Sequence, residues 1–210
     1  MTRWKKIIGI FIAMNGVGCG VAIFLQTGLG GDPIGILCEG ISRLLNIEFG
    51  HASLLYNVLL IGLAAVAASK NIGTGSIVYA ALSGYFIDFY SRSLSVFELQ
   101  HTLLPVKLSV YGAGILLFTM SLAILIYFEL GMNALDALLW KVSERYQVSY
   151  VTVRLITDLS FVGIGYLAGG TFGIGTAVCF LTTGTLIKKF TGLFAAWQVK
   201  CQSNKEVAKA

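Results

Sequence analysis

The sequence predicts an all-α, polytopic membrane protein. Hydrophobic residues make up 56% of the 210 residues and charged residues only 12%, about half the charged share of a soluble domain. The few charges lie between long apolar runs, and glycine is frequent (25 residues) while proline is scarce (2), as in closely packed membrane helices. We therefore expect the chain to fold within a lipid bilayer.

Six stretches are apolar and long enough to span the roughly 30 Å of bilayer hydrocarbon. They are residues 7–26, 52–69, 72–90, 106–128, 150–167 and 172–187. The first follows basic residues, as a secretory signal does, but it is longer than the apolar part of a signal peptide and no small-x-small cleavage site follows it. We therefore expect an uncleaved first transmembrane helix.

Two shorter segments, 33–46 and 134–147, predict amphipathic helices. Each places leucine or isoleucine on one face and charged or amide side chains on the other. Such helices lie at the membrane interface, enter it as re-entrant segments or line a cavity, because their polar face cannot contact lipid. In the first of them, Glu39 and Arg43 form an i,i+4 pair. These two residues line a cavity if the helix is embedded, and are solvated charges if it lies on the surface.

The two halves of the chain repeat the same order of long helix, glycine break, short helix, long helix and Gly-Thr. We interpret this as a duplication with repeats at about 1–91 and 106–192 and a linker at 92–105. Residues 1–192 then form one transmembrane domain, followed by a basic cytoplasmic tail at 193–210. The repeat aligns Asp32 with Asn133, Ser42 with Ser143, Ile47 with Val148, and Asn57 with Asp158.

The number of spans decides how the halves are oriented. Six spans make the two repeats insert in opposite directions, the inverted-repeat plan of many secondary transporters. Eight spans, with the short helices crossing as well, make the halves parallel. Basic residues gather near both ends of the chain, so the positive-inside rule puts both termini in the cytoplasm in either case. Lys70 favours six spans, because only that topology places it on the cytoplasmic side. We expect a multi-pass protein of the cell inner (plasma) membrane.

Three motifs stand out: the glycine break Gly28-Leu29-Gly30-Gly31-Asp32-Pro33, the later Asn57, and the pattern Ile72-Gly73-Thr74-Gly75…Gly84…Asp88. Together they resemble the YczE/YitT family of bacterial integral membrane proteins. YitT-type members also carry a soluble C-terminal domain that is absent from this sequence, so the chain is similar to the short YczE-like form. The resemblance implies a bacterial membrane location and a helical architecture more than an activity.

Ionisable residues inside predicted spans are the first candidates for a solute site. A charge at mid-bilayer costs roughly 2.5–3.5 kcal/mol, so such residues seldom persist without a purpose. Arg154 and Asp158 lie four residues apart on one helix face and can neutralise each other. If they pair, Asp158→Asn strands the charge of Arg154 and should damage the protein more than removal of both charges.

The starts of the two short helices supply the other candidates. Asp32 is followed by Pro33, a strong helix start, and Asn133 is followed three residues later by Asp136. These residues act as ordinary caps, or they point the positive end of a helix dipole at a ligand. The repeat aligns a carboxylate with an amide in both pairs, Asp32 with Asn133 and Asp158 with Asn57, but the carboxylate comes from a different half each time. This arrangement is expected of a pseudo-symmetric site for an asymmetric ligand. The candidate solute-binding residues are thus Asp32, Asn57, Asn133, Asp136, Arg154 and Asp158, with Glu39 and Arg43 as candidates for lining a cavity.

These residues predict a secondary transporter or solute-binding membrane protein for a small polar or anionic solute, with its site between the repeats. Two alternatives stay open. One is a membrane-embedded accessory or assembly factor, and the other is a substrate-binding subunit resembling the small S-components of vitamin importers. Glycine patterns at residues 16–20 and 165–169 allow close helix contact, within the chain or in a homodimer or a complex with a partner membrane protein.

Other classes of function lack their sequence signals. No H-E-x-x-H or G-x-S-x-G motif predicts an enzyme, and the cysteines have no C-x-x-C spacing or neighbouring histidine, so no metal or cofactor is predicted. The basic residues are not interleaved with aromatic ones, which argues against nucleic-acid binding. The expected contacts are therefore the lipid bilayer and a small solute.

Overall fold

A computed structural model describes residues 3–68, 74–127 and 134–207, and within these ranges the chain is helical without a strand. The helices are α1 (Arg3–Thr27), α2 (Pro33–Leu45), α3 (Phe49–Ala68), α4 (Thr74–Ser95), the 3-10 helix η2 (Leu99–His101), α5 (Leu104–Tyr127), α6 (Ala134–Tyr146), α7 (Tyr150–Leu167) and α8 (Ile174–Val207). All eight predicted helices are confirmed, including the two short ones of 13 residues each. The predicted bounds of α7 agree with the structure, whereas α8 continues well beyond its predicted end at residue 187.

Four helices, α1, α3, α5 and α7, are long and apolar enough to cross a membrane when only the described residues are considered. Apolar side chains are exposed along their outer faces, such as Leu59 and Leu63 on α3 and Ile156 and Leu159 on α7. An exposed apolar face of this length suits lipid and not water. The structure therefore supports a helical membrane protein.

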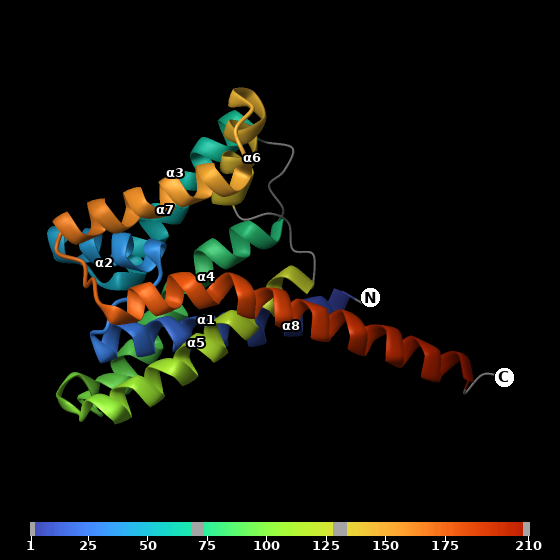
Figure 1. The fold of residues 1–210 in the computed structure, drawn as a ribbon, viewed down its shortest axis with the longest axis horizontal. Coiled ribbons are helices and arrows are strands. Elements are labelled where there is room, and N and C mark those ends of the chain that lie inside the picture. Colours follow the sequence, from blue (N-terminus) through green and yellow to red (C-terminus); the bar gives the residue numbers. More distant parts are fainter. Residues whose placement is uncertain (1–2, 69–73, 128–133, 208–210) are drawn as a thin grey trace.

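The helices form two groups (Figure 1). In the core group, α1 packs between α4 and α5, and α8 packs on α5. The second group, which we call the ring, consists of α2, α3, α6 and α7. These helices contact one another in a closed order: α2 with α3, α3 with α6, α6 with α7, and α7 with α2. Contact between α3 and α4 links the ring to the core group.

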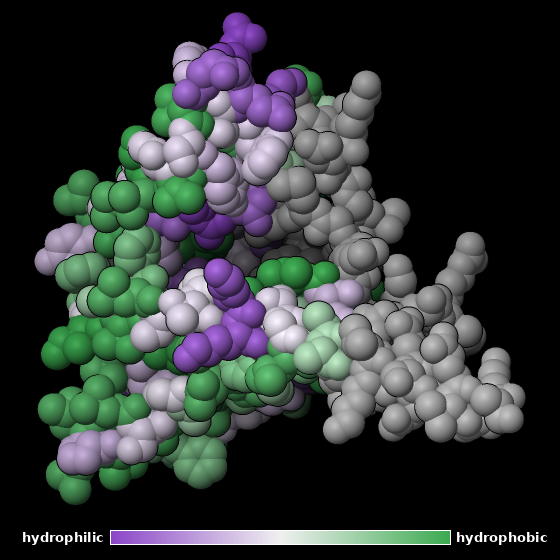
Figure 2. Space-filling model, turned by 45° about the vertical axis from the view of Figure 1, so that its right-hand side comes forward, coloured by the Kyte–Doolittle hydropathy of each residue, from purple (hydrophilic) through white to green (hydrophobic). Residues whose placement is uncertain are grey.

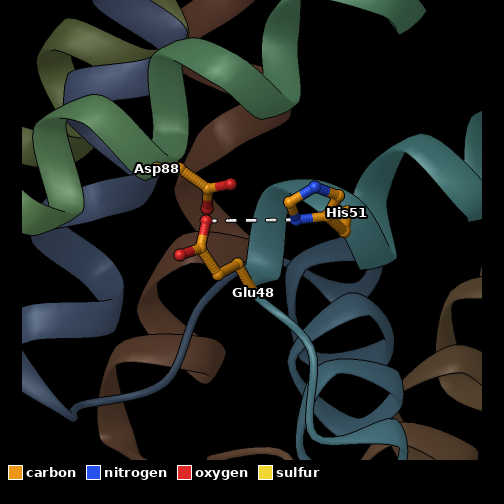
Figure 3. A group of neighbouring side chains, drawn as sticks. All are labelled: Glu48, His51 and Asp88. Carbon is orange, nitrogen blue, oxygen red and sulfur yellow. Dashed lines mark ion pairs between the residues drawn. The ribbon is translucent and has the colours of Figure 1, made fainter.

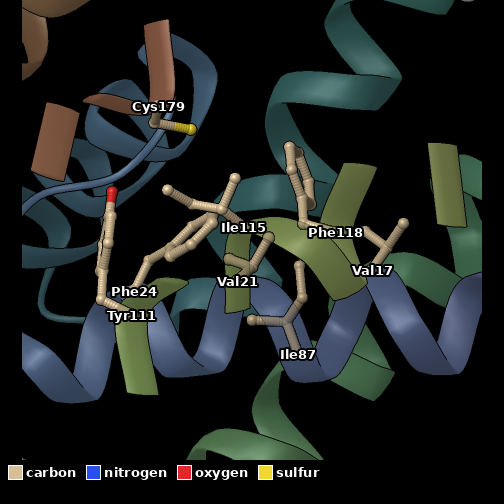
Figure 4. Packing of buried hydrophobic residues seen from close by; sticks show 8 residues of the cluster. All are labelled: Val17, Val21, Phe24, Ile87, Tyr111, Ile115, Phe118 and Cys179. Carbon is tan, nitrogen blue, oxygen red and sulfur yellow. The ribbon is translucent and has the colours of Figure 1, made fainter. Parts of the chain in front are cut away.

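Buried apolar side chains from all four helices fill the core group (Figure 4). They are Val17, Val21, Phe24, Ile87, Tyr111, Ile115, Phe118 and Cys179. The ring of Phe24 lies 4.9 Å from that of Tyr111 and 5.6 Å from that of Phe118, measured between centroids, which joins α1 to α5. Since lipid tails are as apolar as these side chains, close packing rather than the hydrophobic effect holds such helices together.

Glycines let several helix backbones touch. A Cβ added at Gly40 of α2 would lie 2.5 Å from the carbonyl oxygen of Gly165 on α7, and one added at Gly165 would lie 2.6 Å from the backbone of Ile36. On α1, a Cβ at Gly20 would lie 2.8 Å from the Cβ of Phe118. The predicted glycine patterns of α1 and α7 therefore serve packing within the chain.

The predicted glycine break between α1 and α2 docks on the start of α8. Gly30 has a φ of +93°, and a Cβ there would overlap Oγ1 of Thr176. The carbonyl oxygen of Leu29 accepts a hydrogen bond from the amide of Gly175 at 2.9 Å. A side chain at Gly30 would therefore be strained and would also prevent this contact.

The short helices end in the same way. In α2 the hydroxyl of Ser42 donates to the carbonyl oxygen of Ile47 at 2.6 Å, and in α6 the hydroxyl of Ser143 donates to that of Val148, also at 2.6 Å. In both turns the residue before the accepting carbonyl group has a positive φ: Asn46 with 51° and Gln147 with 54°. The hydrogen-bonded residues, Ser42 with Ser143 and Ile47 with Val148, are two of the pairs that the predicted repeat aligns.

We predict that Gly165→Val destabilises the protein by about 1–3 kcal/mol or more, because a side chain there must push α2 away from α7. Gly163→Val is the matched control, since a Cβ at Gly163 meets nothing within 4 Å. Thermal unfolding of the two variants in detergent, followed by circular dichroism, measures the difference. Equal melting temperatures would show that α2 and α7 do not touch at this point.

Candidate functional site

Arg154 of α7 lies between two carboxylates. Its Nη1 donates to Oδ1 of Asp136 on α6 at 2.6 Å, and its Nε donates to Oδ2 of Asp158, one turn along α7, at 3.0 Å. The hydroxyl of Tyr150 donates to the same Asp136 oxygen at 2.8 Å. The predicted pair of Arg154 and Asp158 is confirmed, and Asp136 adds a second partner. This Arg154 network carries one more negative charge than positive.

Asp158 is the most deeply buried member of the Arg154 network, with 8% of its surface exposed. Its Oδ1 has no hydrogen-bond partner within the described ranges, and the same is true of the hydroxyl of Tyr56 on α3, also 8% exposed. The ring of Tyr56 lies 5.9 Å from that of Phe161, measured between centroids, so Tyr56 packs against α7, the helix that carries Asp158. Each buried polar atom without a partner costs about 1–3 kcal/mol, so two in one region call for an explanation.

Asp32 occupies the predicted N-cap position of α2, with extended backbone and Pro33 next to it. Its carboxylate lies beside the backbone amide of Gly35 in the first turn, so the prediction holds for the position of the cap. The charges of Arg154 and Asp158 act on Asp32 across the ring. Asp32 also lines a cavity of about 10 Å³, enough for roughly one water molecule.

The remaining predicted residues are not all at this site. Asn57 is buried on α3, but its amide donates to the carbonyl oxygen of Ser53 at 2.8 Å, within its own helix. Asn133 lies outside the described residues. The structure thus brings Asp136, Arg154 and Asp158 into direct contact and places Asp32 within reach of their charges.

Glu39 and Arg43 join α2 to the connection between α7 and α8. Arg43 donates to Oε1 of Glu39 at 2.6 Å and to the carbonyl oxygen of Gly169 at 2.7 Å. Glu39 also accepts hydrogen bonds from the amide and the hydroxyl of Thr171, at 2.8 and 2.7 Å. Glu39 lines the small cavity beside Asp32, whereas Arg43 does not and is largely exposed. These contacts fix the position of α2 against the second half of the chain.

A second polar cluster, which the sequence analysis missed, lies where α3 begins and α4 ends. Glu48, His51 and Asp88 line a cavity of about 570 Å³ there. The spacing of Glu48 and His51 at the start of a helix was the only local signal. Asp88 is distant in sequence, and only the packing of α3 on α4 brings it to the other two.

The surface has the pattern of a membrane protein. Figure 2 shows hydrophobic side chains over much of one face, with hydrophilic ones gathered near α6 at the top and in a hollow between the upper and lower parts of the molecule. Together with the four apolar helices and the ion-paired Arg154 network, this defines a helical integral membrane protein.

The chain belongs to the family of unknown function DUF6198, whose match covers residues 4–192. It is 24% identical to an uncharacterized protein of Haemophilus influenzae over 92% of this chain and 86% of that protein. It is also 24% identical to the uncharacterized protein YyaS of Bacillus subtilis, over 87% of this chain and 89% of YyaS. The uncharacterized membrane protein YczE of Bacillus subtilis is 22% identical over 68% of this chain and 64% of YczE, which confirms the predicted resemblance. No solved structure matches the chain.

The contact with Asp136 changes which substitution of the Arg154 network should be most damaging. Asp158→Asn leaves Arg154 paired with Asp136, so it does not strand the guanidinium as the sequence suggested. Arg154→Ala, in contrast, leaves two carboxylates without their cation. We predict that Arg154→Ala destabilises the protein more than Asp158→Asn does. The loss should lie between the roughly 1 kcal/mol of an exposed pair and the 3–5 kcal/mol of a buried one.

Thermal unfolding in detergent checks this order, with Arg145→Ala as the control because Arg145 is an exposed arginine at the end of α6. A loss in Arg154→Ala no larger than in Arg145→Ala would mean that the Arg154 network contributes nothing to the fold.

Proposed function

We propose that this protein binds a small polar solute inside the ring and moves it across the membrane as a secondary transporter. The observation that carries the proposal is the buried Oδ1 of Asp158, which lacks a partner within the described residues although it lies beside a charged, hydrogen-bonded network. An ionisable group at membrane depth is costly, and in membrane proteins it usually marks a solute or ion pathway. The first half of the chain supplies α2 and α3 of the ring and the second half supplies α6 and α7, so a site there lies between the halves.

The charge of the Arg154 network favours a particular class of solute. Two carboxylates face one guanidinium, and the charges of this network also act on a third carboxylate, Asp32. A solute with a protonated amine or a guanidinium would neutralise the excess negative charge and could donate hydrogen bonds to Asp158. We therefore favour a cationic or zwitterionic solute over the anionic one that the helix starts suggested.

The proposed architecture is an inverted repeat of six spans with α2 and α6 embedded as short helices. Two observations support the duplication: α2 and α6 end in the same hydrogen-bonded turn, and most helix contacts have a counterpart in the other half, with the contact of α3 and α4 as the exception. Contact of α2 with α7 corresponds to that of α6 with α3, and contact of α1 with α4 to that of α5 with α8. Transporters built in this way hold their solute at the interface between the repeats.

We place the protein in the bacterial inner membrane with both termini in the cytoplasm, because basic residues gather near both ends of the chain. Reporter fusions test the span count. Six spans predict a fusion at Lys70, which lies outside the described residues, on the cytoplasmic side and a fusion at Gln100 on the outer side. A fusion at Lys70 reporting from outside, or both fusions from one side, would contradict this topology.

The solute class can be tested by ligand-induced stabilisation. We expect at least one member of a panel of small amines, guanidinium compounds and amino acids to raise the melting temperature of the detergent-solubilised protein. We expect Asp158→Asn to abolish that shift. Glu144→Gln is the matched control, because this α6 carboxylate is exposed and contacts only Trp140 among the bonds that the structure describes. Uptake of the same compound into proteoliposomes then tests transport.

The outcomes separate the alternatives. Stabilisation by carboxylic acids in place of amines, again lost in Asp158→Asn, would keep the site and overturn its proposed charge. Binding without uptake would favour the substrate-binding subunit of an importer. Equal responses of Asp158→Asn and the control, or no response to any compound, would argue against a solute site and for an accessory factor.

A further inference from the structure

The contact between α3 and α4 creates a defined arrangement of side chains at one end of the two helices. A Cβ at Gly84 would lie 2.5 Å from the carbonyl oxygen of Gly50, and the packing is equally close in the other direction. With the backbones this close, the carboxylate of Asp88, one turn after Gly84, reaches the start of α3. Its Oδ1 accepts a hydrogen bond from the amide of Gly50 at 2.7 Å.

Two further side chains meet Asp88 at this point (Figure 3). Glu48 lies in the connection before α3 and His51 in its first turn, and one ligand atom of each of the three residues lies within 4.8 Å of the others. Oε1 of Glu48 pairs with Arg92, while its Oε2 lies 3.9 Å from Nδ1 of His51. One carboxylate oxygen of Glu48, one of Asp88 and an imidazole nitrogen thus face a common point.

We propose that Glu48, His51 and Asp88 bind a divalent transition-metal ion, with Zn²⁺ as the probe. One imidazole and two carboxylates are established ligand types for such ions. The two carboxylates outnumber the single guanidinium of Arg92, so a bound cation would balance the charge of the cluster. No other arrangement of at least three such ligand atoms is found in the described part of the chain.

The distances require only a small adjustment. Ligand atoms at about 2.0–2.2 Å from Zn²⁺ in a tetrahedral site lie roughly 3.3–3.6 Å from one another. The present spacing is therefore at most about 1–1.5 Å too wide. The side chains of Glu48 and His51 are 47% and 67% exposed, so they can rotate into place while Asp88 stays anchored to Gly50.

The cavity beside the cluster leaves room for a further ligand. Its volume of about 570 Å³ is within the range of roughly 300–1,000 Å³ typical of small-molecule sites, and Tyr85 and Phe89 also line it. A metal ion held by three side chains keeps at least one coordination position for water or a small anionic group, as open zinc sites do. The metal site lies apart from the Arg154 network and does not depend on the proposed solute.

Isothermal titration of the tag-free, full-length protein in detergent with ZnCl₂ tests the proposal. We expect one tight site per chain, weakened at least tenfold by His51→Ala and by Glu48→Gln. His101→Ala, which removes the other histidine of the chain, should change the affinity by less than twofold. Replacement of Zn²⁺ by Co²⁺ should give visible d–d bands without a thiolate charge-transfer band, because the cluster contains no cysteine.

Several results would overturn the metal site. They are Zn²⁺ binding that is equally tight in wild type, His51→Ala and Glu48→Gln, an equal loss of affinity in His101→Ala, and a thiolate band with Co²⁺. Absence of any Zn²⁺ binding to the wild type would overturn it as well. None of these measurements involves the solute panel. A negative result for the metal site therefore does not bear on the transport proposal, which has its own test.

Discussion

Contact between helix backbones at glycine is the constraint on which the rest of the structure depends. Gly40 meets Gly165 between α2 and α7, and Gly50 meets Gly84 between α3 and α4. In lipid, where apolar side chains gain little by meeting one another, this closeness allows extensive dispersion contact and short hydrogen bonds between helices. The first contact holds α2 where Glu39 reaches the connection between α7 and α8, and the second brings Asp88 to the start of α3. The contact of Glu39 with Thr171 and the cluster of Glu48, His51 and Asp88 are therefore set by positions that themselves carry no side chain.

The two polar regions solve different physical problems. The Arg154 network joins α6 and α7, and its guanidinium is paired with one carboxylate from its own helix and one from α6. One oxygen of Asp158 is left over among the described residues, at a cost that a purely structural ion pair would not need. The cluster of Glu48, His51 and Asp88 lies at a helix start, half open to its surroundings, where water can solvate its charges. The first region suits a solute that replaces water, and the second suits an ion that has shed part of its hydration shell.

Local sequence signals predicted the helices well and the contacts between them only in part. Each helix follows from an apolar run or an amphipathic period bounded by glycine or polar residues, which are properties of neighbouring positions. The pair of Arg154 and Asp158 was predictable for the same reason, since it lies on one helix turn. The bond from Arg154 to Asp136 and the approach of Asp88 to His51 depend on which helices pack together, and no spacing along the chain encodes that. Asn57 shows the converse, because its alignment with Asp158 suggested a shared site while its amide bonds to its own helix.

The closed order of the ring has a mechanical consequence. Each short helix packs against a long helix of the opposite half, α2 on α7 and α6 on α3. The two halves are therefore interlocked. Rocking one half against the other would break both of these helix contacts and the hydrogen bonds that Glu39 accepts from Thr171. Contacts between the ring and the core group run mainly through α3 and α4. Any cycle that opens the Arg154 network first to one side and then to the other would therefore have to break one of these contacts or the equally close contact of Gly50 with Gly84 between α3 and α4.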